Sequence, residues 1–209
     1  MGNMLIFRQF AMCVVALFSV TVLSAQSAEE WLGSLNESLG ERYSMSTVVQ
    51  IGDGESVSEE LAGLFMVDGD GYYLSLGVME VFSDGKLRYE VNNERKEATI
   101  DRVDLESHDL LTNPTNAFAF AGDEFQISII SSDDKVACIG LVPRDEIGIT
   151  DIKLRLKRDA SGEVVPESIT YNYDGDVVRI LLSDVGDGDW TLPRWDERAY
   201  RAYDVVSFI

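Results

Sequence analysis

The stretch YYLSLGVMEVFSDGKLRYEV, residues 72–91, decides the fold class, because short runs of aromatic and aliphatic residues alternate in it with turns. One break falls at Gly77 and another at Asp84-Gly85, a dipeptide typical of tight hairpins. The stretch therefore predicts consecutive antiparallel hairpins with an apolar face. Two uses of that face are open: an ordinary packed core, or the wall of a cavity that receives an apolar guest.

The same two-residue period runs from Tyr43 onward, broken by turn residues at intervals typical of antiparallel sheets. Asp70-Gly71 and Asp174-Gly175 mark two further hairpin turns. We expect a meander of about ten or eleven strands, at residues 43–51, 61–67, 72–76, 78–82, 86–91, 97–103, 124–130, 135–142, 151–157, 167–173 and 177–182.

Two of these segments show which side of the sheet is apolar. In residues 151–157 (DIKLRLK) isoleucine and leucine alternate with lysine and arginine, and in residues 87–91 (LRYEV) apolar residues alternate with Arg88 and Glu90. A strand with this pattern turns one face to the core and the other to water. We therefore expect a sheet with one dry and one wet face.

Residues 28–42, AEEWLGSLNESLGER, carry the clearest helical pattern. Trp31, Leu32, Leu35 and Leu39 recur at three- and four-residue spacing, with glutamates on the opposite side. Ser27 and Glu30 together form a capping box at the start of the helix. The helix has one apolar stripe, which another part of the protein must cover.

Two later segments depart from the strand pattern. Between the sixth and seventh strands, Asn113-Pro114 predicts the start of a short helix, and Phe118 and Phe120 add apolar area there. Residues 189–209, DWTLPRWDERAYRAYDVVSFI, are expected to form an extended edge segment with a final short strand.

The N-terminal residues resemble a targeting segment. An apolar run from residue 10 to residue 23 follows Arg8 and has the length of a signal-peptide core, which is short for a membrane span. Cleavage after Ala25 would leave Ser27 in place for the capping box, while cleavage after Ser27 stays open. We expect residues 1–25 to be a signal peptide that directs export, and residues 26–209 to form a single domain.

Composition and charge narrow the function. The chain has 209 residues, 45% of them hydrophobic, which suffices for a buried core. Its formal net charge is −20, so nucleic acid and anionic membrane surfaces would repel it at long range. Cys138 is the one cysteine outside the signal segment, which rules out an internal disulfide in the mature monomer.

Side chains suited to catalysis are scarce. His108 is the only histidine, so a Ser-His-Asp triad would have to use it, and one His with Cys138 cannot build a multi-ligand metal site. The runs DGDG (68–71) and DVGDGD (184–189) lack the spacing of a calcium loop and are interpreted as turns. No glycine-rich phosphate loop opens a helix. We expect no enzyme activity, no metal and no cofactor.

Several motifs, taken in order, resemble a known family. They are Gly63-x-Phe65, the turn Ser83-Asp84-Gly85-Lys86, Tyr89, Asn92, and Asn113-Pro114 before the helical insert. Residues 63–120 and, later, 151–185 resemble the outer-membrane lipoprotein carrier family, the LolA-like periplasmic lipid-binding proteins. The family's Arg-Pro pair is replaced here by residues 67–70, VDGD, so the basic residue associated with closing of its lid is missing.

This resemblance implies a mostly antiparallel α+β fold, a strongly curved unclosed β-barrel whose helices cover the concave face and enclose an apolar cavity. It implies a monomeric carrier that shields acyl chains of lipoproteins or related lipids on the way to the outer membrane. An inner-membrane donor complex and an outer-membrane acceptor are the implied partners. The residues expected to contact lipid are Trp31, Leu35, Leu39, Phe65, Tyr73, Met79, Phe82, Tyr89, Phe118 and Phe120.

Two other functions fit the same pattern. One is an adaptor that senses a lipid or peptide and docks a partner protein, for which the acidic surface would suit a basic partner. The other is a cofactor-free enzyme that uses the cavity as a reaction chamber. Lipid that co-purifies with the protein would indicate a carrier, and one stable protein partner would indicate an adaptor.

Overall fold

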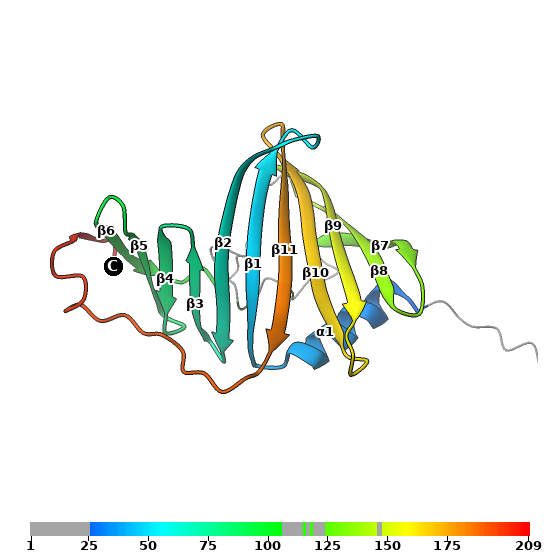
Figure 1. The fold of residues 1–209 in the computed structure, drawn as a ribbon, viewed down its shortest axis with the longest axis horizontal. Helices are drawn as coiled ribbons and strands as arrows, with labels where there is room; N and C mark the ends of the chain where they lie inside the picture. The colour runs from blue at the N-terminus through cyan, green and yellow to red at the C-terminus, as the bar shows by residue number, and fades with distance from the viewer. Residues whose placement is uncertain (1–25, 106–114, 116–117, 119–123, 146–147) are drawn as a thin grey trace, which may run out of the picture.

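The computed structural model describes residues 26–105, 115, 118, 124–145 and 148–209. In it, helix α1 (Ala28–Leu39) begins where the capping box predicts (Figure 1). The Ser27 hydroxyl accepts the Glu30 N–H at 3.2 Å, and the Glu30 carboxylate accepts the Ser27 N–H at 2.8 Å. The helix ends at Leu39 rather than at residue 42, because Gly40 adopts a positive φ of 59°. The predicted signal peptide and second helix lie outside the described residues, apart from residues 115 and 118.

Twelve strands in the described part of the chain form one sheet. They are β1 (Arg42–Gly52), β2 (Val57–Asp68), β3 (Gly71–Leu76), β4 (Met79–Ser83), β5 (Leu87–Asn92), β6 (Glu97–Arg102), β7 (Phe125–Ser132), β8 (Val136–Pro143), β9 (Ile149–Arg158), β10 (Val164–Tyr173), β11 (Asp176–Gly186) and β12 (Asp204–Ser207). Their order across the sheet is β12-β6-β5-β4-β3-β2-β1-β11-β10-β9-β8-β7. Strands β1–β6 form one antiparallel meander and β7–β11 a second, joined where β1 pairs with β11 (Figure 1).

All predicted strands are present, and β12 is the short final strand predicted near the C-terminus. It pairs in parallel with β6, placing Asp204 opposite Glu97 and Ser207 opposite Ile100. Strand β2 begins at Val57 rather than at the predicted residue 61. The start was missed because its first four residues, VSEE, are all exposed and carry no apolar alternation. The sequence pattern therefore marks the part of a strand that faces the core rather than its whole length.

The Asp-Gly dipeptides form the tight turns that they predict. Asp174 and Gly175 join β10 to β11 with φ values of 50° and 91°, the two positive values that a two-residue type I′ hairpin requires. Between β4 and β5, the Asp84 carboxylate accepts the N–H groups of Lys86 and Leu87, both at 2.9 Å. These turns hold the strands in the antiparallel register that sets the two faces of the sheet.

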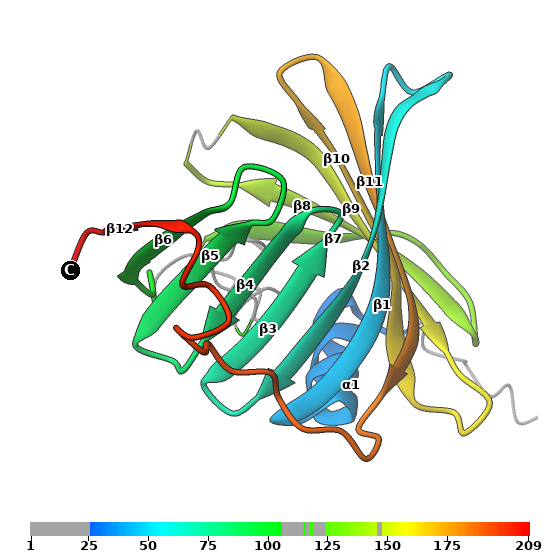
Figure 2. The ribbon, with the colours of Figure 1, turned by 60° about the vertical axis from the view of Figure 1, so that its left-hand side comes forward.

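The sheet is strongly curved, and α1 lies inside the curve (Figure 2). Its edge strands, β12 and β7, do not pair with each other, so the barrel is unclosed. Helix α1 packs against β10 and β7 on the concave face, where most of the buried apolar side chains gather. This confirms the predicted curved, unclosed barrel with a helix over its concave face. Within the described residues, no helix has the length and apolar character needed to cross a membrane.

Candidate functional site

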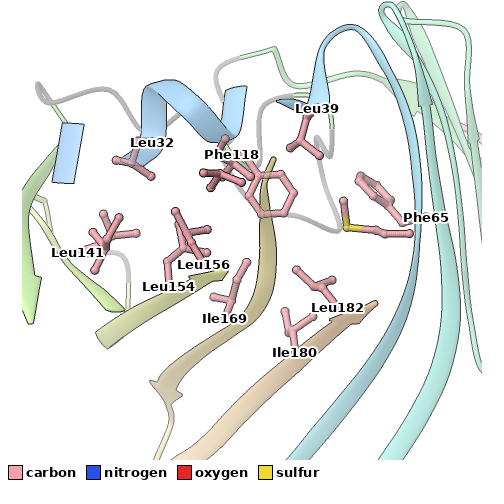
Figure 3. Packing of buried hydrophobic residues seen from close by; sticks show 14 of the residues in the cluster. Leu32, Leu39, Phe65, Phe118, Leu141, Leu154, Leu156, Ile169, Ile180 and Leu182 are labelled. Atoms are coloured by element: carbon pink, nitrogen blue, oxygen red, sulfur yellow. The ribbon is translucent and has the colours of Figure 1, made fainter. Parts of the chain in front are cut away.

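The apolar stripe of α1 meets the concave face of the sheet. Trp31 is 1% exposed, Leu35 is fully buried and Leu39 is 6% exposed, because their three- and four-residue spacing places them on one side of the helix. Phe65 of β2 and Phe118 belong to the same buried cluster. Figure 3 shows Leu39 and Phe118 facing the sheet residues Ile169, Ile180 and Leu182. Five of the predicted lipid-contacting residues are thus brought together.

Met79 and Phe120 are two further predicted lipid contacts. Met79 is two positions before Val81, a member of the concave cluster, so the alternation of β4 turns Met79 to the same face. It is half-buried and lies at the start of β4. Phe120 lies outside the described residues.

Tyr73, Phe82 and Tyr89 lie on the opposite, outer face of the sheet, which corrects the expectation that all the predicted residues share one dry face. They are directly opposite one another across β3, β4 and β5. Their neighbours Tyr72, Leu74 and Val81 take the concave face instead. Apolar residues occur on both faces of β3 and β4, so their sequence gives no alternation from which to choose a face. In β5 the alternation identifies Tyr89 and Val91 as the apolar side, but this side is the outer one.

The cover of the outer face comes from the C-terminal segment, residues 187–209 (Figure 2). Trp195 stacks between Tyr89 and Tyr200, with ring centroids 5.1 Å and 4.6 Å away and interplanar angles of 9° and 3°. We call this group the outer aromatic cluster; its members are Tyr73, Phe82, Tyr89, Val91, Ala98, Trp195, Tyr200 and Tyr203. Its C-terminal members were not predicted from sequence, although the Trp and Tyr content of residues 195–203 was an available signal.

Glu80 holds the outer aromatic cluster together through hydrogen bonds. Its carboxylate accepts the Tyr73 hydroxyl at 2.7 Å, the Tyr200 hydroxyl at 3.2 Å and the Asn93 amide at 2.8 Å. Burial and the nearby Glu80 carboxylate raise the pKa of Tyr73 to about 12, and they raise the pKa of Tyr200 as well. This carboxylate therefore ties the C-terminal segment to β3 and β4.

The concave cluster extends well beyond the residues predicted from sequence. Sequence alternation in the ninth predicted strand, residues 151–157, indicated part of it, and the remainder follows from strand register. The fully or nearly fully buried members include Met45, Tyr72, Leu74, Ile139, Leu141, Leu154, Leu156, Val164, Ile180 and Leu182. The concave face is thus a continuous apolar surface that crosses from β4 to β8.

Polar atoms are rare within this apolar surface. Burial raises the pKa of the Tyr43 hydroxyl. Thr47 Oγ1 and Trp31 Nε1 are buried without a hydrogen-bond partner in the described part of the chain. The Arg158 guanidinium lies 4.9 Å from the Trp31 ring centroid and donates to Gln26 Oε1 at 3.0 Å, which fixes the start of α1 against β9.

Two hollows beside the described residues are not lined by the predicted lipid contacts. One, of about 70 Å³, lies beside the β1–β2 hairpin near Gly54. The other, a groove of about 540 Å³, follows the exposed side of α1 past Glu30 and Glu37. On the concave face, α1 packs against β10 and β7.

The described residues hold no group of three or more His, Cys, Asp or Glu side chains placed to bind a metal ion. Residues 68–71 form the turn between β2 and β3, and residues 184–189 cover the end of β11 and the loop after it. Cys138 of β8 is half-buried and unpaired. His108 lies outside the described residues.

No family model and no curated protein matches the chain. Among solved structures, an uncharacterized conserved protein from Thermus thermophilus matches with a TM-score of 0.51 and 12% identity, over 86% of this chain and 98% of that one. A LolA superfamily protein from Nitrosomonas europaea matches with a TM-score of 0.40 and 10% identity, over 83% and 97%. LprF from Mycobacterium bovis matches with a TM-score of 0.45 and 13% identity, over 82% and 99%.

The first of these matches shows a common fold, and at 12% identity it shows the fold alone. The other two TM-scores are too low to establish a shared fold by themselves. One of the matched structures is described as a LolA superfamily protein.

Proposed function

We propose that the protein is a carrier that binds the acyl chains of lipoproteins or related lipids on the concave face of its sheet, beneath α1. The observation that carries this proposal is the continuous apolar concave face with one twelve-residue helix packed on it. Only Gly40 and Glu41 separate α1 from β1, so the helix can swing about this short connection while the sheet stays intact. Such a helix acts as a lid.

The energetics of transfer allow cargo to enter between the lid and the sheet. Each methylene removed from water contributes about 0.8 kcal/mol, so roughly forty methylenes of a lipoprotein anchor contribute on the order of 30 kcal/mol. Lifting α1 exposes Trp31, Leu32, Leu35 and Leu39, which costs about 10 kcal/mol at 1.5–3 kcal/mol for each side chain. Bound acyl chains therefore stabilise the open form by more than the lid stabilises the closed form.

The lipid contacts follow from the faces of the sheet. On this proposal Trp31, Leu35 and Leu39 of the lid, Phe65 and Met79 of the sheet, and Phe118 touch the cargo. Tyr73, Phe82 and Tyr89 hold the C-terminal segment on the outer face instead. The lid residues would cover one side of the acyl chains, and the sheet would cover the other side.

The cellular setting comes from the sequence. Residues 1–25 would direct export, and the protein would act as a periplasmic monomer that takes lipid from an inner-membrane donor and passes it to an outer-membrane acceptor. The acidic surface, with 37 acidic and 17 basic residues, would keep the carrier off anionic membranes between these two encounters.

The position of the tryptophans gives a direct test. The chain has three, and Trp31 lies on the concave face while Trp195 lies in the outer aromatic cluster. One variant, Trp190→Phe with Trp195→Phe, keeps only Trp31, and a matched variant, Trp31→Phe with Trp190→Phe, keeps only Trp195. A brominated fatty acid quenches a tryptophan that it touches. We expect strong quenching of Trp31 and little quenching of Trp195.

Mass spectrometry of the purified protein completes the test, because a carrier should retain lipid from the cells that made it. Quenching of Trp195 alone would place the lipid on the outer face and contradict the proposed site. The carrier function would be wrong if no lipid co-purified and neither tryptophan responded. A single stable protein partner in a pull-down would then favour the adaptor.

A further inference from the structure

Thr47 of β1 carries a buried hydroxyl that has no partner. Its side chain is 4% exposed, and Oγ1 makes no hydrogen bond to any residue that the structure describes. Strand β1 is central in the sheet and is paired with β2 on one side and β11 on the other. Burying an unpaired hydroxyl is unfavourable, so a native protein that keeps one needs a reason for it.

The surroundings of Thr47 offer its hydroxyl little to bind. Met45 and Val49 flank it on the same face of β1, and Leu182 stands opposite on β11. Across the other pairing, Gly63 faces Thr47, and a Cβ on Gly63 would lie 3.0 Å from Thr47 Cγ2. The methyl group is therefore turned to β2, and the oxygen sits among apolar side chains of the concave face.

Trp31 Nε1 and Ser38 Oγ are also buried without a hydrogen-bond partner among the described residues, but both belong to the lid. When α1 lifts, both groups move with the helix and can reach water. Thr47 stays, because its backbone is held on both sides by paired strands. Of these groups, Thr47 is the one that remains on the sheet when cargo enters.

We propose that Thr47 Oγ1 donates a hydrogen bond to a carbonyl oxygen of the cargo, so that the concave face favours ester- or amide-linked acyl chains over equally long chains without a carbonyl. This inference rests on the proposed carrier function and adds to it a preference for lipids that carry a carbonyl group. A lone donor within an apolar surface suits a ligand whose single acceptor group adjoins a hydrocarbon chain. A chain lacking the carbonyl would leave the hydroxyl unpaired, which disfavours its binding.

The test compares two lipids that differ only in this group: ester-linked dipalmitoylglycerol and its dihexadecyl ether analogue. Each displaces a fluorescent fatty-acid probe from the full-length mature protein. We expect the ester lipid to bind about tenfold more tightly, the ratio that one buried hydrogen bond supplies. Thr47→Val keeps the shape and removes the hydroxyl, so both lipids should bind it equally. Thr47→Ser keeps the hydroxyl and should retain the preference.

Stability provides a second readout, which checks folding. Because Thr47→Val removes an unpaired buried hydroxyl, its denaturation midpoint without lipid should equal or exceed that of the unchanged protein. Equal binding of ester and ether lipids by the unchanged protein would overturn the role of Thr47 and leave the carrier function standing. An ester preference that survives in Thr47→Val would also overturn the role of Thr47 and leave the carrier function standing. If the probe and both lipids fail to bind, the carrier function itself is wrong, and this inference falls with it.

Discussion

Glu80 is the residue on which the hydrogen bonds of the outer aromatic cluster converge. Its carboxylate accepts hydrogen bonds from Tyr73, Tyr200 and Asn93, and Asn93 Oδ1 in turn accepts a hydrogen bond from the Tyr203 hydroxyl at 2.9 Å. Each tyrosine must keep its proton to donate. The cluster is therefore stable only while these phenols are neutral.

This requirement predicts a loss of stability in alkali. The folded protein raises the pKa of Tyr73 from 10.0 to about 12, so the unfolded chain loses this proton first as the pH rises. The stabilisation is fully present below pH 10 and is lost as the pH rises towards about 12. Chemical denaturation at pH 8 to 12, followed by tryptophan fluorescence, should show a falling free energy of unfolding over this range.

In Tyr73→Phe the free energy of unfolding should fall less steeply with pH, because one phenol with a raised pKa is gone. Tyr200 and Tyr43 keep their raised pKa values. Tyr173→Phe is the matched control, since Tyr173 is 54% exposed at the end of β10. An unchanged slope in Tyr73→Phe would show that the Tyr73 hydroxyl is not held by Glu80 in solution.

At the scale of the element, the capping box determines how firmly the lid forms. Ser27→Ala removes the acceptor of the Glu30 N–H and should destabilise α1 by about 1 kcal/mol. Hydrogen exchange followed by mass spectrometry should show faster exchange for residues 28–39 than in the unchanged protein. Ser34→Ala, in the middle of the same helix, is the control and should exchange as slowly as before. Equal exchange in both variants would contradict a role for the cap in closing the lid.

The C-terminal segment is predicted to act independently of the lid. Trp195→Ala removes the ring that stacks between Tyr89 and Tyr200, which should lower the free energy of unfolding by about 2 kcal/mol. Because these rings lie on the outer face, the affinity for a fluorescent fatty-acid probe should stay unchanged under conditions where the variant is folded. A large loss of probe affinity would show that the two faces are coupled.

Elements were predictable from sequence wherever a single face was buried. The α1 stripe and its cap placed the helix correctly, and residues 151–157 identified their own buried side. The face of β3 and β4 was not predictable, because Tyr73 and its neighbour Leu74 are both apolar and lie in different clusters. Tyr73 is covered by Tyr200, whose hydroxyl donates to Glu80, 120 residues away in the chain. Local periodicity carries no information about a contact between residues so far apart in sequence.

At the scale of the whole molecule, one curved sheet separates two apolar layers with different tasks. The outer layer is closed by the chain's own C-terminal segment, through aromatic stacking and the Glu80 hydrogen bonds. The concave layer packs against α1, which has a short connection to β1. On the proposed carrier function, α1 opens to admit cargo while the C-terminal segment keeps the outer layer covered.

The net charge of −20 predicts how such a carrier delivers its cargo to a membrane. Transfer of a fluorescent fatty-acid probe to vesicles requires close approach, which anionic lipid opposes at long range. At about 0.01 M salt, where the screening length is about 30 Å, transfer to vesicles containing phosphatidylglycerol should be slower than transfer to pure phosphatidylcholine. At about 1 M salt, where that length is about 3 Å, the two rates should converge.

The opposite result would point to a local surface that overrides the net charge. Lys153, Arg155 and Lys157 form a basic row on the outer face of β9, although Asp151 and Glu167 pair with them. If transfer to the anionic vesicles is faster, replacing all three with glutamine should abolish the acceleration. Because paired surface charges contribute little net attraction, we expect this variant to behave like the unchanged protein, with repulsion by the whole acidic surface setting the rate.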